Sequence, residues 1–248
     1  MKSFGLTDKG AVRQENQDSF LLEKCPEKNC LIAVLCDGMG GAKAGGLASR
    51  LSNRAFASKV FDRLRSSSGR TVNYRDILLS SCSETNGVAY AYSHFSEDYE
   101  GMGTTLVAAV IKNNGNGYII NVGDSRAYLI SPRRGGVRQI TRDHSLVEEL
   151  VRFGAITPEQ AREHPKRNVI TRALGTEPGV DADYFECKLQ RGDVLLLCSD
   201  GLSNTVQDWE MLKAARQHRD PEKLCHSLME LALTRGARDN VTVLTVIR

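Results

Sequence analysis

Short apolar segments, gathered into groups that alternate with helical patterns, constrain the fold of this chain more than any other feature. Segments of this kind, bounded by Gly, Asn or Pro, are typical of strands joined by tight turns. The predicted strands are Phe20–Glu23, Leu31–Cys36, Thr104–Ile111, Gly117–Val122, Arg126–Ile130, Gly136–Ile140, Tyr184–Leu189, Val194–Cys198 and Val241–Ile247. Because several of these segments are apolar on both faces, we expect sheets that are sandwiched between other layers.

Amphipathic patterns predict helices in the intervals between the strand groups. Leu47, Leu51 and Ala55 share one face of a helix predicted over Ala44–Leu64. Ser145 and Thr157 each begin a capping box, a Ser or Thr followed three residues later by Glu or Gln. Helices are therefore also predicted over Asp76–Tyr92, over Ser145–Phe153, from Thr157 and from Asp220. Strand groups alternating with helix groups predict an α+β fold in which helices cover antiparallel sheets.

Composition excludes several classes of protein. The 248 residues contain 41% hydrophobic and 25% charged residues, which are values of a globular chain and exclude wholesale disorder. The formal net charge of +3, without a Lys/Arg run, is too small to indicate nucleic-acid binding. No repeat or low-complexity linker divides the chain, and Arg65–Arg70 has the composition of a connecting loop. We therefore expect one domain over residues 1–248.

The sequence also favours a particular compartment. The longest strictly apolar run, Leu31–Cys36, is too short to span a bilayer, and MKSFGLTDKG lacks the apolar core of a signal peptide. The seven cysteines are scattered without a C-x-x-C pair, which argues against structural zinc and favours free thiols. We therefore expect a cytoplasmic protein with no membrane partner.

Five aspartates stand at the ends of the predicted strands. Asp37, Asp124 and Asp200 follow apolar runs, whereas Asp18 and Asp239 precede them. If these strand ends converge, the carboxylates repel one another, and a hard cation such as Mg²⁺ or Mn²⁺ compensates them. Taken singly, each aspartate is also explained by a turn, because Asp-Gly is a strong hairpin signal. The five histidines lack paired spacing, which argues against zinc.

Other phosphate chemistries find little support. The loop Gly38–Gly46 follows a predicted strand and opens a helix, as phosphate-binding loops do, but Lys43 breaks the dinucleotide fingerprint and Ala44 breaks the P-loop. A flexible tight turn explains this loop equally well. A thiol phosphatase needs an Arg six residues after its Cys, and no cysteine has one. The G-x-S-x-G elbow of serine hydrolases is absent as well.

The motifs taken together resemble a known family. In order, the chain carries TDKGAVRQENQDSF, VLCDGMGGAKAGG, GMGTTLVAAVI, INVGDSRAYLI, ITRDHSL, NVITRALG, LLLCSDGLSN and ARDNVTVLTVI. This series resembles the PPM family of metal-dependent protein serine/threonine phosphatases (protein phosphatase type 2C), in its compact bacterial form. The resemblance extends from Thr7 to Val246 and implies a four-layer αββα sandwich, with two antiparallel sheets flanked by helix pairs.

The resemblance also implies a metal centre built from the aspartates. By position, Asp37 would bridge two Mn²⁺ or Mg²⁺ ions, and the carbonyl of Gly38 would bind one of them. Asp200 and Asp239 would complete the other, so that Asp37, Asp200 and Asp239 form the catalytic set. Asp124 would bind a third, more weakly held ion together with Asp200.

Two further residues and one segment take roles by the same resemblance. Asp18 would lie beside the metal ions and orient waters, and Arg13 would grip the substrate phosphate. The residue-level alternative for Arg13 is a surface arginine that pairs with Glu15. The stretch from Asp143 to about Val180, with its two short capped helices, would form a flap beside the site.

Three positions depart from the family pattern. Gln17 stands where many members carry Glu, which would weaken binding of the second metal ion. Ala42 replaces a His that is common in bacterial members. Met39 stands where animal relatives carry a His that acts as general acid, so this sequence names no side chain for that role.

The function implied is hydrolysis of phosphoserine and phosphothreonine in proteins by a metal-bridging water, with no phosphoenzyme. The partners implied are phosphoprotein substrates and a cognate Ser/Thr kinase, and we expect a monomer. Two alternatives remain at this point. A phosphoesterase acting on nucleotides or small phosphates would share the site, and a catalytically dead phosphoprotein-binding regulator would lack metal-binding acids.

Overall fold

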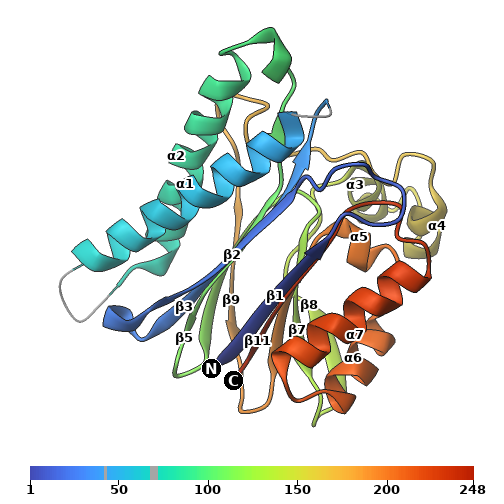
Figure 1. Ribbon diagram of the computed structural model, residues 1–248. Coiled ribbons are helices and arrows are strands. Elements are labelled where there is room, and N and C mark those ends of the chain that lie inside the picture. The colour runs from blue at the N-terminus through green and yellow to red at the C-terminus, as the bar shows by residue number, and fades with distance from the viewer. Residues whose placement is uncertain (42–43, 68–71) are drawn as a thin grey trace.

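The computed structural model describes residues 1–41, 44–67 and 72–248. Within them, the strands form two antiparallel sheets that lie face to face, as Figure 1 shows. The strands are β1 (Lys2–Asp8), β2 (Asp18–Cys25), β3 (Cys30–Met39), β4 (Gly103–Thr104), β5 (Leu106–Lys112), β6 (Asn116–Val122), β7 (Arg126–Ser131), β8 (Gly136–Gln139), β9 (Asp183–Lys188), β10 (Val194–Cys198) and β11 (Val241–Ile247). One sheet has the order β1-β11-β10-β7-β8, and the other has the order β2-β3-β5-β6-β9, with β4 paired to β3.

Helices cover the outer face of each sheet (Figure 1). The α-helices are α1 (Ala44–Ser66), α2 (Tyr74–Ser93), α3 (Leu146–Arg152), α4 (Pro158–Glu163), α5 (Asp200–Ser203), α6 (Asp208–Gln217) and α7 (Pro221–Thr234), and the short 3-10 helices are η1 (Pro26–Lys28) and η2 (Glu97–Tyr99). Helices α1 and α2 pack on the sheet that contains β3, whereas α6 and α7 pack on the sheet that contains β10. The four-layer αββα sandwich predicted from the sequence is confirmed. None of the described helices is long and apolar enough to cross a membrane.

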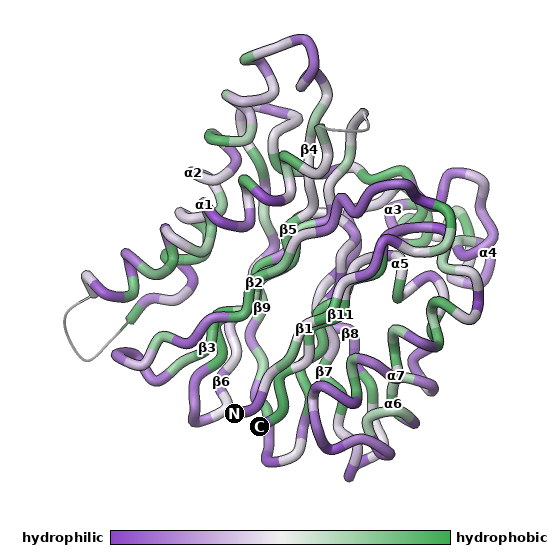
Figure 2. Tube along the Cα trace, viewed as in Figure 1, coloured by the Kyte–Doolittle hydropathy of each residue, from purple (hydrophilic) through white to green (hydrophobic). Residues whose placement is uncertain are grey.

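The alternating side chains of β3 explain why its sequence is apolar on both faces. Leu31, Ala33 and Leu35 lie in the layer between the two sheets, together with residues of β5, β10 and β11. Ile32 and Val34 point the other way, into the layer beneath α1 and α2. Figure 2 shows the hydrophobic stretches concentrated on the strands of the sandwich. Burial on both faces removes the period-two pattern that marks a strand with one solvated face.

The structure adds elements that the sequence pattern does not predict. Strand β1 (KSFGLTD) runs through Gly5, where an added Cβ would lie 2.5 Å from Cε2 of Phe20 on β2. The ring of Phe20 therefore packs against the bare backbone of Gly5, and this glycine hides an otherwise regular strand in the sequence. Helix α6 is also unpredicted, and its N-cap is Gln207 rather than a Ser or Thr, with the Gln207 backbone N–H donating to Glu210 Oε2 at 3.0 Å. The connecting-loop prediction at Arg65–Arg70 falls partly outside the described residues.

Candidate metal centre

Strand direction brings the five predicted aspartates to one rim of the sandwich. Asp18 begins β2 and lies opposite Asp37 near the end of β3 in the antiparallel register. β6 runs parallel to β3, because β5 pairs antiparallel with both, so Asp124 follows β6 at the same rim. In the other sheet, Asp200 follows the end of β10, and Asp239 precedes the start of its antiparallel partner β11.

Asp18 joins the two sheets at this rim. Its Oδ2 accepts hydrogen bonds from Ser199 Oγ at 2.8 Å and from Thr242 Oγ1 at 2.6 Å, and in the opposite sheet Thr242 lies in β11 while Ser199 directly follows β10. Thr242 Oγ1 also lies 2.7 Å from Thr7 Oγ1 on β1. The carboxylates of the two sheets therefore belong to a single site. The sequence pattern gives no sign of these hydroxyl contacts, because their partners are more than 180 residues apart.

The pKa values of the acids show that they share one electrostatic field. Burial raises the pKa of Asp37 well above its usual range, and the charges of the other four aspartates raise it further. Burial is also the main cause of the raised pKa of Asp200, followed by the charges of Asp124 and Asp239. Burial raises the pKa of Asp18 to about 6, against the hydrogen bonds from Thr242 and Ser199. The pKa of Asp124 is likewise raised to about 6, chiefly by burial.

The donor set fits a divalent cation, although the acids do not form a finished cage. Among the described residues, no three His, Cys, Asp or Glu side chains are arranged to hold a metal ion as they stand. However, Oδ1 of Asp18 and Oδ1 of Asp200 are buried and accept no hydrogen bond. A buried acceptor without a partner is costly, and repulsion among carboxylates adds to that cost. A hard cation relieves both costs, and carboxylate oxygens are its preferred ligands.

Gly38 lies where only a glycine fits. A Cβ at this position would lie 2.0 Å from the carbonyl oxygen of Gly45 in the first turn of α1, and 2.8 Å from that of Gln17. The backbone N–H of Gly38 donates to Gln17 O at 3.2 Å. The Asp-Gly pair at 37–38 is therefore not a hairpin turn, because β3 continues through it to Met39 and pairs with β4. Two residues of interest, Ala42 and Lys43, lie outside the described residues.

Arg13 lies on the acid cluster. Its NH2 donates to Asp239 Oδ2 at 2.7 Å, and its side chain is 57% exposed. The hydrogen bond and charge of Asp239 raise the pKa of Arg13, and the charges of Asp200 and Asp37 raise it further. The structure thus places this guanidinium at the edge of the site, where it pairs with Asp239 and not with Glu15.

Asn240 is a site residue that the sequence analysis misses. Its buried side chain donates through Nδ2 to Lys9 O at 2.9 Å and to Glu15 O at 3.0 Å, and its Oδ1 accepts from Gln17 N at 2.8 Å. These three bonds fasten the segment 9–17, which carries Arg13, to the turn before β11. The only available signal is the Asp-Asn pair at 239–240, which reads equally well as an ordinary turn.

The turn that carries Asp124 is tied to Asp37. Thr105 Oγ1 accepts a hydrogen bond from Asp37 N at 3.0 Å and lies 2.8 Å from Ser125 Oγ. Gly123 has a φ of +100°, and a Cβ there would lie 2.6 Å from Thr105 Cγ2. Glycine at 123 therefore lets this turn approach the strand end that presents Asp37.

The predicted flap contains helices α3 and α4. Ser145 Oγ accepts from Glu148 N as predicted, but the reciprocal bond, from Ser145 N to the Glu148 carboxylate, is not formed, whereas Thr157 and Gln160 form a complete capping box. An isolated β-bridge between Ser145 and Ile170 closes the base of this segment.

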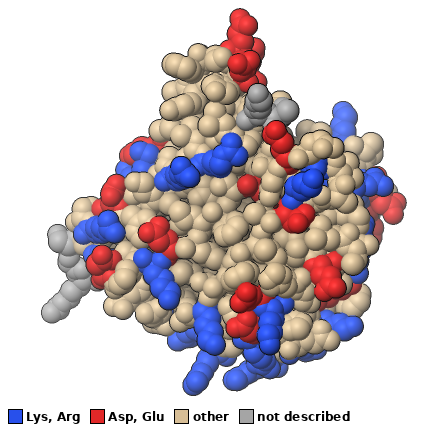
Figure 3. Space-filling view, in the orientation of Figure 1, with Lys and Arg blue, Asp and Glu red and all other residues tan. Residues whose placement is uncertain are grey.

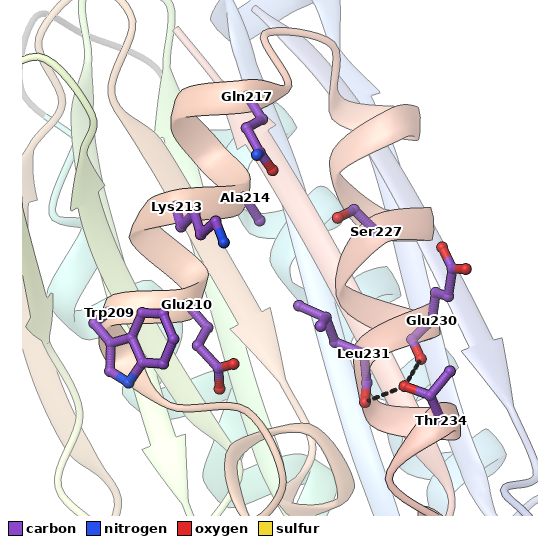
Figure 4. A pocket seen from close by; sticks show the side chains of 9 residues that line it. All are labelled: Trp209, Glu210, Lys213, Ala214, Gln217, Ser227, Glu230, Leu231 and Thr234. Carbon is purple, nitrogen blue, oxygen red and sulfur yellow. Dashed lines mark hydrogen bonds between the residues drawn. The ribbon is translucent and has the colours of Figure 1, made fainter.

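A groove of about 290 Å³ lies elsewhere, between α6 and α7 (Figure 4). Its lining includes Trp209, Lys213 and Glu230, and none of the five aspartates borders it. On the face seen in Figure 3, acidic and basic side chains are interspersed, with Lys and Arg more numerous at the lower edge. Chemistry that needs several carboxylates is therefore located at the rim and not in this groove.

Comparison with known proteins shows the class of phosphatase to which this fold and its rim of acids belong. The family described as protein phosphatase 2C matches residues 9–230. The chain belongs to this family.

Relatives extend the likeness over almost the whole chain. The serine/threonine phosphatase stp of Listeria monocytogenes is 38% identical over 242 residues, which cover 98% of this chain and 94% of that protein. The crystal structure of the serine/threonine phosphatase Stp1 from Staphylococcus aureus has a TM-score of 0.89 at 37% identity and covers 99% of this chain and 94% of its own. The catalytic domain of the phosphatase PstP, described in complex with two manganese ions, has a TM-score of 0.82 at 36% identity, with 98% and 96% covered.

Proposed function

We propose that this protein hydrolyses phosphoserine and phosphothreonine in phosphoproteins by a metal-dependent mechanism without a phosphoenzyme. The observation that carries the proposal is the gathering of five aspartates at one rim, two of them with buried oxygens that accept no hydrogen bond. Family membership and the activity by which the relatives are named support the substrate class.

The proposed ligands are the residues assigned by resemblance. Asp37 would bridge two Mn²⁺ or Mg²⁺ ions, with the Gly38 carbonyl on one of them and with Asp200 and Asp239 on the other. Asp124 would hold a third ion with Asp200. The presence of two manganese ions in the PstP structure supports divalent metal dependence. When bound, the cations lower the pKa of a water molecule and draw charge from the phosphoryl oxygens.

The chain's own residues would position the substrate and the acids. Arg13, already directed at the rim, would make a charge-assisted contact with the phosphate. Asp18, which is held by Ser199 and Thr242, would orient waters beside the ligands without moving itself. Asn240 would keep Arg13 in place through the segment that its side chain fastens.

We further propose that residues 1–248 act as one catalytic domain, with the flap at about 143–180. The protein would act as a monomer in the cytoplasm, in signalling, on substrates of a cognate Ser/Thr kinase. The bridge between Ser145 and Ile170 supports treating the flap as a distinct subregion.

A dephosphorylation assay tests the main proposal. The protein is incubated with a phosphothreonine peptide in Mn²⁺, in Mg²⁺ and in chelator, and in parallel with a small aryl phosphate. We expect metal-dependent release of phosphate from the peptide. Activity that survives thorough chelation would overturn the metal mechanism, and hydrolysis of the small ester alone would overturn the substrate class.

A further inference from the structure

His144 is a buried histidine that contacts the turn before Asp124. Its ring Nδ1 accepts a hydrogen bond from the backbone N–H of Gly123 at 3.1 Å. Its own backbone N–H donates to the carbonyl of Gly123 at 3.0 Å. One residue of the 143–180 segment therefore holds both polar groups of the glycine that precedes Asp124.

The hydrogen bond at Nδ1 fixes the tautomer of the ring. Because Nδ1 accepts a hydrogen bond, the neutral ring carries its hydrogen on Nε2, which lies 3.4 Å from Asp183 Oδ2 and 3.4 Å from Arg172 NH1. Arg172 NH1 contacts the same carboxylate through Oδ1 at 3.4 Å. Burial, followed by the charge of Arg172, lowers the pKa of His144, which favours the neutral ring.

The backbone of His144 also closes the base of the flap. Thr171 N donates to His144 O at 2.8 Å, and Leu146 N donates to Val169 O at 2.9 Å. Residues 144–146 and 169–171, which flank the part of the flap that carries α3 and α4, therefore meet at the residue that holds Gly123. Asn121 reinforces this junction, since its Nδ2 donates to the carbonyls of both Gly123 and Arg142 at 3.1 Å.

We propose that His144 is a positioning residue that fixes Asp124 for the accessory cation and couples the occupancy of that site to the order of the flap. The inference rests on the proposed role of Asp124. A buried histidine whose polar atoms merely find partners would serve packing alone. His144 differs because one of its partners is the amide next to a candidate ligand, and because the flap closes on its own backbone. By linkage, a cation at Asp124 should order the flap to the same extent that flap order tightens the cation.

Two substitutions separate the two ring nitrogens. In His144→Asn, the amide oxygen stands near the position of Nδ1 and can still accept from Gly123 N–H, but it cannot reach Asp183. In His144→Gln, the longer amide reaches toward Asp183 and leaves Gly123 N–H without its acceptor. Both variants remove the ring, so a role in packing alone predicts the same effect for both.

The test measures Mn²⁺ binding by titration of the free ion in wild type, Asp124→Ala, His144→Asn and His144→Gln, and hydrogen exchange at Gly123 and along the flap. One Mn²⁺ site should be lost in Asp124→Ala. We expect His144→Gln to lower the Mn²⁺ affinity of that same site by roughly tenfold, because one buried hydrogen bond is lost. It should also speed exchange at Gly123 and in the flap. His144→Asn should stay close to wild type in both readouts.

Equal weakening in the two His144 variants, or none in either, would overturn the positioning role. Mn²⁺ that orders the wild-type flap no better than it orders the flap of Asp124→Ala would overturn the coupling. A wild-type titration without any site sensitive to Asp124→Ala would instead refute the assignment of Asp124, which is a failure of the proposed function. Melting curves of each variant verify that the compared proteins are folded.

Discussion

Replacing Asn240 by Ala should release the segment that carries Arg13 from the rim. The Asn240 side chain makes three hydrogen bonds, to the backbone of Lys9, Glu15 and Gln17. At about 1 kcal/mol for each bond, the free energy of unfolding should fall by about 3 kcal/mol. For a chain of this size, that corresponds to a drop in melting temperature of roughly 6–12 °C.

The assay combines melting, limited trypsin digestion and kinetics. Trypsin should cut the variant faster after Lys9 and Arg13, and kcat/KM on a phosphopeptide should fall by about tenfold or more, because a displaced Arg13 loses a charge-assisted contact. Asn114→Ala is the matched control, since that exposed side chain accepts one backbone bond, from Asn116, at the opposite end of its sheet. Wild-type melting, digestion and kcat/KM in Asn240→Ala would refute the reasoning.

The remaining predictions concern the acids and Arg13. Asp37→Asn and Asp239→Asn should each nearly abolish turnover and lower Mn²⁺ stoichiometry without unfolding the protein, and wild-type turnover at limiting Mn²⁺ in either would contradict the ligand assignment; the exposed Asp62→Asn serves as control. Arg13→Ala should lower kcat/KM by about ten- to a hundredfold, with partial rescue by lysine. The exposed ion pair between Arg13 and Asp239 contributes only about 0–1 kcal/mol. The Mn²⁺ concentration that gives half-maximal activity should therefore change less than about fivefold in Arg13→Ala, and a larger rise would make Arg13 part of the metal site. In chelator, the protein should lose stability as pH rises from about 4 through about 6, because folding raises the pKa of the Asp18 and Asp124 carboxyls to about 6. Mn²⁺ should restore the lost stability at pH 7.5. A melting temperature that rises with pH in chelator would contradict this argument.

The sequence predicts the strands well because its signals are local. Each predicted apolar run overlaps a strand, although Thr104–Ile111 is divided between β4 and β5, and helix α1 ends at Ser66, within two residues of the predicted end at Leu64. Strand β1 is not predicted because Gly5 weakens its local signal, and the contact of Gly5 with the ring of Phe20 on β2 cannot be read from the sequence. Helix α6 escapes because its cap is a glutamine, which is rare at that position.

In the candidate site as well, local sequence signals predict some residues and not others. Strand-end placement suffices to propose Asp37, Asp124 and Asp200, since period and turn residues locate strand ends. The supports of the site do not follow from such patterns. Ser199 and Thr242 hold Asp18, and Asn240 holds the segment 9–17, and each of these contacts depends on how the two sheets meet. Their positions follow from tertiary packing, which the periodicity of the sequence does not predict.

The five acids at the rim lower the stability of the metal-free fold, but the proposed function depends on them. Repulsion among five acids at the meeting point of two sheets makes the metal-free fold less stable, so replacing Asp37 or Asp200 by a neutral residue relieves part of it. Selection for a durable fold alone would therefore erode this cluster, and inactive descendants of the scaffold would arise at no loss of robustness.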